Sequence, residues 1–185
     1  MGYAGGTTPN PTYRRIGDHT ETFQVDFDPD VITYDDLLGL FWRSHNPAHK
    51  VWSRQYRAIV LYQNDGQRDA AQRSRAALMA IGKSVATDIA PLTTFYLAET
   101  YHQKYMLRNT PLMADIETIY PDEQDWINST AAARLNGYLG GYGQAETFDR
   151  DIKLLGLSAD GEEFLRQRVG RRITRLTCPL PDRTR

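Results

Sequence analysis

The chain has 185 residues, 41% of them hydrophobic and 24% charged, with a formal net charge of −1. This length suffices for one domain with an appendage and a core of its own, and the near-zero charge excludes a globally basic nucleic-acid binder. No apolar run approaches the roughly 20 residues that cross a bilayer, no signal-peptide pattern is visible, and the single cysteine, Cys178, excludes an internal disulfide, so we expect a soluble cytoplasmic protein without nucleic-acid or membrane partners.

The first half of the chain alternates strand and helix patterns. Phe23, Val25 and Phe27 alternate with polar residues, which predicts a strand over 20–28 that stops at Pro29. Apolar residues at helical spacing predict a helix over 34–42, with Thr33 as its N-cap. A second strand is predicted over 55–63.

A proline-free stretch rich in Ala, Arg, Gln and Leu predicts a helix from 65 to about 85. Two strand segments follow over 87–90 and 93–99, interrupted by Pro91, and then a short helix over 101–108. Strands that alternate with helices in this way predict an α+β protein, a two-layer sandwich in which helices pack on a mixed sheet.

Beyond residue 109 the strand patterns disappear and helical patterns replace them. Helices are predicted at about 112–119, 123–135, 147–156 and 159–175, with a glycine-rich break at 136–143. We therefore divide the chain into a core over residues 1–109 and a helical extension over residues 110–185 that packs on it.

The most informative segment is the N-terminal one, Gly2–Tyr13, which reads GYAGGTTPNPTY. Paired glycines, prolines flanking an asparagine and a tyrosine near each end describe a tightly turned aromatic loop of the kind displayed beside a pocket.

This loop and three later blocks resemble, in order and in spacing, the peptide methionine-S-sulfoxide reductases of the methionine sulfoxide reductase A family. The later blocks are His19–Glu21 with Phe27–Pro29, Ile32–Tyr34 and Leu37–Trp42; His45–Pro47 with Arg54–Arg57; and Thr87–Ile89 with Thr94–Glu99 and Tyr101–Tyr105. The resemblance implies an enzyme, a peptide-methionine (S)-S-oxide reductase of protein repair in oxidative stress. Its substrate is methionine sulfoxide, free or in proteins, its external reductant is thioredoxin, and it needs no bound cofactor.

Reduction of a sulfoxide requires a thiolate that attacks sulfur and hydrogen-bond donors aimed at the sulfoxide oxygen. By resemblance, Tyr3 and Tyr56 match the two oxygen-facing tyrosines of the family. We place Glu21 with them as a candidate catalytic acid, because it follows the loop. Trp52 and His19 are candidate substrate-binding residues. Each also has a structural alternative, as a packing aromatic, a solvated carboxylate or an ordering histidine.

The sequence departs from the family pattern at several positions. Arg15 stands where the family has an acidic residue, Val51 where it has an aspartate, and Leu139 where a resolving cysteine is expected. The family's Gly-Cys-Phe-Trp motif, which carries the nucleophile, is absent, so we expect the sequence to be the enzyme without its first strand and that turn. Cys178 is a candidate resolving thiol, or an incidental one.

Two rival interpretations stay open. A catalytically inactive module would keep the tyrosines and bind methionine sulfoxide or a peptide without reducing it. A structural or interaction protein would instead depend on the helical extension, which shows no clear family match. The histidines lack metal-ligand spacing, so we expect no metal site. The arginines of the helix beginning near Glu162 are interpreted as a solvated face.

Overall fold

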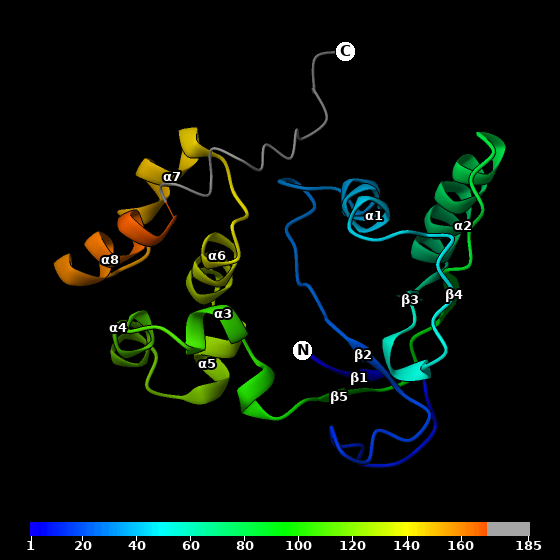
Figure 1. The fold of residues 1–185 in the computed structure, drawn as a ribbon, viewed down its shortest axis with the longest axis horizontal. Helices are drawn as coiled ribbons and strands as arrows, with labels where there is room; N and C mark the ends of the chain where they lie inside the picture. Colours follow the sequence, from blue (N-terminus) through cyan, green and yellow to red (C-terminus); the bar gives the residue numbers. More distant parts are fainter. Residues whose placement is uncertain (170–185) are drawn as a thin grey trace. The chain divides into compact units, whose positions relative to one another are not determined.

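The computed structural model describes residues 1–169, which form two compact units (Figure 1). The first unit comprises Met1–Glu99 and contains the described β-strands, and the second begins at Thr100 and is helical. The α+β class and the helical C-terminal part are thereby confirmed.

The N-terminal unit contains a three-stranded antiparallel sheet in the order β2 (Thr20–Thr22), β1 (Gly2–Ala4), β5 (Phe95–Leu97). Tyr3 occupies the middle of the central strand, where it pairs with Glu21 on one side and Tyr96 on the other. A side chain at Gly2 would come within 2.4 Å of the Tyr96 carbonyl oxygen, so this position of β1 requires glycine.

A second, parallel sheet pairs β3 (Ile59–Tyr62) with β4 (Asp88–Pro91). The crossover between them contains helix α2 (Asp65–Ala80), against which helix α1 (Tyr34–Arg43) packs (Figure 1). The parallel and antiparallel pairings thus lie in two separate small sheets. A modest apolar core joins these elements: Leu38, Trp42, Val60, Ala70 and Ala71.

The predicted start of α1 is confirmed in detail. The Thr33 hydroxyl accepts a hydrogen bond from the Asp36 N–H at 3.1 Å, and the Asp36 carboxylate accepts one from the Thr33 N–H, which forms a capping box. The predicted helix over 65–85 ends early, at Ala80, where Gly82 adopts a left-handed φ of +80°.

Three predicted strands are shorter in the structure, and the one predicted over 93–99 comprises only Phe95–Leu97. The strand predicted over 20–28 ends at Thr22, and Phe23 and Val25 are 65% and 50% exposed, so their alternation covers no apolar surface. The strand predicted over 55–63 begins only at Ile59, and a 3-10 turn, η1 (Arg54–Tyr56), precedes it.

The second unit consists of short helices around one apolar core. They are η2 (Thr100–His102), α3 (Tyr105–Arg108), α4 (Leu112–Ile119), α5 (Glu123–Asn128), α6 (Thr130–Leu139), α7 (Ala145–Ile152) and α8 (Ala159–Val169). Leu112, Ile116, Leu135, Ile152 and Leu165 are fully buried between them. The residues of α8 predicted beyond 169 lie outside the described residues.

The single helix predicted over 123–135 divides at Ser129. The Ser129 hydroxyl accepts a hydrogen bond from the Ala132 N–H at 3.0 Å and caps the N-terminus of α6. Helix α6 then continues to Leu139, into the segment predicted as a glycine-rich break, and the chain turns only at Gly140 and Gly141.

The boundary between the units falls at Glu99, earlier than the predicted 109. Local contacts explain this. The Asn136 side-chain oxygen accepts hydrogen bonds from the N–H groups of Met106 and Leu107, at 3.0 and 3.3 Å, and Leu107 is fully buried in the helical core. The packing of the helical extension on the core stays a prediction.

Candidate functional site

The N-terminal loop is held in shape by one carboxylate. Asp18 accepts hydrogen bonds from the backbone N–H and the hydroxyl of both Thr7 and Thr8, at 2.8–3.0 Å. Those donors, the Thr8 N–H above all, hold the pKa of Asp18 far below its usual value. Gly5 has a φ of +75°, and a side chain at Gly6 would meet the Asp18 carboxylate at 2.6 Å, so the paired glycines permit this closure.

Glu99 connects the two tyrosines of the loop. The buried Tyr3 hydroxyl donates to Glu99 Oε2 at 2.7 Å, and the Tyr13 backbone N–H donates to Glu99 Oε1 at 3.0 Å. One carboxylate therefore fixes both ends of the loop relative to β5.

A different part of the chain, the turn η1, brings Tyr56 to this loop. The Thr20 hydroxyl donates to the Arg54 carbonyl oxygen at 2.9 Å, and the Gln55 amide donates to Glu21 Oε1 at 2.6 Å. Both bonds attach η1 to strand β2, so Tyr56 and the half-buried Glu21 become neighbours although they are far apart in sequence.

The Tyr56 hydroxyl lies at the surface of this cluster, with the residue 54% exposed. Its pKa is raised above the ordinary value, first by a hydrogen bond with the Tyr13 side chain, then by burial and by the negative charge of Glu21. Like any tyrosine, whose ordinary pKa is about 10, Tyr56 carries its proton at neutral pH. A protonated phenol beside an exposed face is a hydrogen-bond donor for a ligand oxygen.

We call Tyr3, Tyr13, Glu21, Tyr56 and Glu99 the tyrosine–carboxylate cluster. The structure thus places the three predicted catalytic residues in one region, with Tyr56 and Glu21 in proximity and Tyr3 linked to Tyr13 through Glu99. Sequence reasoning assigned no role to Tyr13 or Glu99, although both lie inside the quoted blocks; only the fold shows that they meet.

His19 lies behind the loop and not on its surface. It is 1% exposed, its Nε2 lies 2.8 Å from the Thr8 carbonyl oxygen and therefore carries the proton, and its ring meets the Tyr96 ring edge-on at 5.4 Å. This position supports the loop backbone. The predicted contact of His19 with the substrate stays a prediction.

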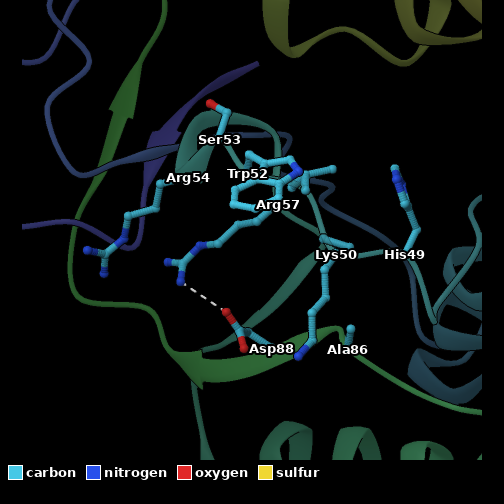
Figure 2. A pocket seen from close by; sticks show the side chains of 10 residues that line it. His49, Lys50, Trp52, Ser53, Arg54, Arg57, Ala86 and Asp88 are labelled. Atoms are coloured by element: carbon cyan, nitrogen blue, oxygen red, sulfur yellow. Dashed lines mark hydrogen bonds and ion pairs between the residues drawn. The ribbon is translucent and has the colours of Figure 1, made fainter.

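Trp52 lies at the surface beside the cluster's η1 turn. Its side chain is fully exposed and lines a cavity of about 440 Å³ together with basic residues (Figure 2). The structure thus places Trp52 at the edge of a cavity, and its contact with a substrate stays a prediction.

The positions that depart from the family pattern have separate surroundings. Arg15 is exposed and pairs through its backbone with Thr12; Val51 lines the cavity with Trp52; and Leu139 is buried in the helical core. Cys178 lies outside the described residues. Within residues 1–169, no group of three or more His, Cys, Asp or Glu side chains is arranged to hold a metal ion, and no helix is long and apolar enough to span a membrane.

Comparisons with known proteins decide the family. Residues 1–134 match the family model described as peptide methionine sulfoxide reductase. The chain belongs to this family of oxidoreductases, which confirms the resemblance. Residues 122–170 also match the helical domain described for selenoprotein methionine sulfoxide reductase A. This match corrects the view that the helical extension has no family counterpart, which was the basis of the structural-protein interpretation.

Individual relatives agree with this membership. A peptide methionine sulfoxide reductase of Drosophila melanogaster is 36% identical over 167 residues, which are 89% of this chain and 67% of the relative. Peptide methionine sulfoxide reductase MsrA of Methanothermobacter thermautotrophicus is 41% identical, with coverage of 59% and 72%, and the rice protein A5 is 36% identical, with coverage of 75% and 57%. The matched part of the chain therefore spans between 57% and 72% of the length of these three relatives.

Among solved structures, reduced Mxr1 from Saccharomyces cerevisiae is similar, with a TM-score of 0.53 and 31% identity. The match covers 58% of this chain and 68% of Mxr1.

Proposed function

We propose that this protein acts in the thioredoxin-coupled reduction of methionine-S-sulfoxide, free or peptide-bound, to methionine. Family membership supports the reaction class. The observation that carries the proposal for this chain is the tyrosine–carboxylate cluster, in which the half-exposed Tyr56 hydroxyl lies beside Tyr13 and Glu21.

A sulfoxide oxygen carries substantial negative charge and accepts hydrogen bonds. It must gain a proton as its bond to the methionine sulfur breaks and the oxygen passes to the attacking thiol. Tyr56 donates to this oxygen, and Tyr13 and Glu21, which both act on the Tyr56 hydroxyl, orient it. Tyr3 acts indirectly: its hydroxyl donates to Glu99, and Glu99 accepts from the Tyr13 N–H and so holds Tyr13 in place.

The electrons come from thiols. A thiolate attacks the sulfoxide sulfur, the oxygen leaves with that thiol as a sulfenic acid, and methionine is released. A second thiol condenses with the sulfenic acid, expelling water and forming a disulfide, which thioredoxin reduces. None of residues 1–169 is a cysteine, so both thiols belong to other segments or molecules. Cys178 is the candidate for the second.

Ligand binding tests the role of the cluster separately from turnover. In calorimetric titrations with the N-acetyl methylamide of methionine-S-sulfoxide, we expect binding, and none with the thioether or the R-sulfoxide at the same concentrations. Tyr56→Phe removes one donor, which is worth about 0.5–1.5 kcal/mol, and should weaken binding about two- to tenfold.

The matched control is Tyr142→Phe, which removes an exposed hydroxyl in the helical unit and should leave binding unchanged. Equal affinity of the unaltered protein for sulfoxide and thioether would contradict the proposal.

Turnover decides between the enzyme and the binding module. Oxidation of NADPH is followed with thioredoxin, thioredoxin reductase and the S-sulfoxide, using the protein isolated from its native host. Turnover supports the reductase, and its loss in Cys178→Ser would assign that thiol. Binding without turnover would favour the sulfoxide-binding module.

A further inference from the structure

A polar cavity adjoins the proposed site and is separate from its reacting groups. It is formed by the segment 49–54 and by Arg57, Ala58, Ala86 and Asp88, and its volume is about 440 Å³ (Figure 2). Arg54 is both a wall of this cavity and the first residue of the turn that ends at Tyr56. The turn η1 therefore contributes one residue, Arg54, to the cavity wall and another, Tyr56, to the tyrosine–carboxylate cluster.

One of the cavity's cations is already neutralised. The Arg57 guanidinium forms an ion pair with Asp88 at 3.0 Å and donates to the Thr20 hydroxyl oxygen at 2.9 Å and to the Gly5 carbonyl oxygen at 3.4 Å. Arg57 is thus a structural link between β4, β2 and the N-terminal loop, and its charge is balanced by Asp88.

The other two cations are not balanced. Lys50 and Arg54 are exposed, and neither has an ion-pair partner among the described residues. Since Asp88 is the only carboxylate in the cavity wall and is engaged by Arg57, the cavity has two positive charges in excess. A concave wall with an excess of one sign attracts ligands of the opposite sign.

Trp52 gives this charged wall an aromatic surface. It is fully exposed, whereas the other two tryptophans, Trp42 and Trp126, are 8% and 3% exposed. A large exposed aromatic beside an arginine is the composition of protein-binding hot spots, where the ring covers the partner's backbone and the guanidinium binds a carboxylate.

We propose that this cavity is a subsite for an aspartate or glutamate side chain of a peptide or protein that carries the oxidised methionine. The inference rests on the proposed function and makes it more specific, because it names acidic, peptide-bound methionine sulfoxide as the preferred substrate. Arg54 and Tyr56 are two residues apart, so their Cα atoms are separated by at most about 7.6 Å. An extended peptide advances about 3.3 Å per residue, which puts the carboxylate two or three positions from the methionine.

Four peptides test the subsite. All lack tryptophan and tyrosine; two contain methionine-S-sulfoxide and two contain methionine, and within each pair a glutamate or a glutamine stands two residues away. Trp52 is the exposed fluorophore, so its emission reports occupancy, and Trp52→Phe identifies the signal. We expect the glutamate sulfoxide peptide to bind about fivefold more tightly than its glutamine counterpart.

Variants locate the effect. Arg54→Glu and Lys50→Glu should each abolish the preference for glutamate, while the affinity for the glutamine sulfoxide peptide stays within about twofold. Arg73→Glu makes the same charge change at an exposed position of α2, outside the cavity, and should keep the preference. Loss of the preference in Arg73→Glu as well would attribute it to net charge and overturn the subsite.

The peptide set separates this inference from the proposed function. A preference for the sulfoxide with no preference for glutamate would overturn the subsite and leave the proposed function standing. A preference for glutamate combined with equal affinities for the sulfoxide and thioether peptides would contradict the proposed function, and with it the assignment of this cavity to a sulfoxide-bearing substrate.

Discussion

The two units of the protein are stabilised in different ways. The helical unit has a continuous apolar core, whose members include Leu112, Ile116 and Leu135, all fully buried. The N-terminal unit has a much smaller apolar core, and its loops are joined by directed hydrogen bonds to Asp18, Glu21 and Glu99.

This difference matches the demands on each unit. Apolar burial is non-directional and contributes stability in proportion to area, whereas a hydrogen bond fixes the distance and angle between particular atoms. The site lies in the unit where side-chain hydrogen bonds set the geometry. Core substitutions in the helical unit should therefore change stability, and polar substitutions in the N-terminal unit should change binding more than stability.

The largest effect is expected from Leu135→Ala, in the middle of the helical core. Deleting this fully buried side chain should lower the free energy of unfolding of the helical unit by about 2–5 kcal/mol. Urea unfolding followed by circular dichroism at 222 nm measures it, because helices dominate that signal. The control Leu154→Ala changes a leucine that is 71% exposed and should cost less than about 0.5 kcal/mol. Similar losses for both variants would contradict the proposed role of this core.

A smaller loss is expected from Tyr138→Phe. The Tyr138 hydroxyl donates to Asp151 Oδ2 at 2.9 Å, inside the helical unit, and Arg150 contacts the other oxygen at 3.0 Å. Removing the hydroxyl leaves a buried carboxylate oxygen under-bonded and should cost about 1–3 kcal/mol. Tyr142→Phe, at a 70% exposed position, is the matched control in the same urea titration. An unchanged unfolding midpoint in Tyr138→Phe would show that the two arginines paired with Asp151, Arg150 and Arg134, satisfy it without the phenol.

Glu99→Gln tests a polar residue of the N-terminal unit. The Glu99 carboxylate accepts hydrogen bonds from the Tyr3 hydroxyl and the Tyr13 N–H. The glutamine amide keeps only one acceptor oxygen and carries no charge. Charge-assisted bonds are roughly twice as strong as neutral ones, so we expect sulfoxide affinity to fall about three- to tenfold. Calorimetric titration measures it, and Glu117→Gln, exposed on α4, should have no effect. If Glu99→Gln lowers the free energy of unfolding more than the free energy of sulfoxide binding, this would contradict the view that polar residues of the N-terminal unit serve binding more than stability.

The smallest effect is expected from Asp18→Asn, and it should depend on pH. The Thr8 and Thr7 donors lower the pKa of Asp18 in the folded state, so its stabilising contribution is complete above the unfolded value, near 3.8, and is lost as the pH falls below it. Thermal unfolding at pH 7 should therefore show a lower Tm for Asp18→Asn than for the unaltered protein, and the difference should shrink towards pH 2–3. A difference that is constant over this range would show that the carboxylate charge is not the cause.

Much of the fold could be predicted from the sequence because the signals were local. Thr33 and Asp36 form a capping box, which marks the start of α1 in the sequence. The helix predicted from the periodicity of residues 112–119 has the bounds observed for α4. The strand ends could not be predicted, because Phe23 and Val25 alternate as in a strand although no partner surface covers them. The break at Ser129 depends on a single cap that competes with an otherwise continuous helical pattern.

The candidate site was predictable only in part. The loop residues and Tyr56 were found by resemblance, but the bonds that join them connect residues far apart in sequence, such as Tyr3 to Glu99 and Glu21 to Gln55. Such pairs leave no periodic signal. The burial of His19 was equally invisible, since a histidine after a glycine loop looks the same whether it faces the ligand or the loop backbone.

The proposed function depends above all on a hydrogen bond from the Tyr56 hydroxyl to the sulfoxide oxygen. A crystal structure of the protein with methionine-S-sulfoxide tests it most directly. We expect the sulfoxide oxygen to lie within about 2.5–3.0 Å of the Tyr56 Oη. A bound sulfoxide whose oxygen faces solvent or backbone groups, with Tyr56 bonded only to Tyr13, would contradict it.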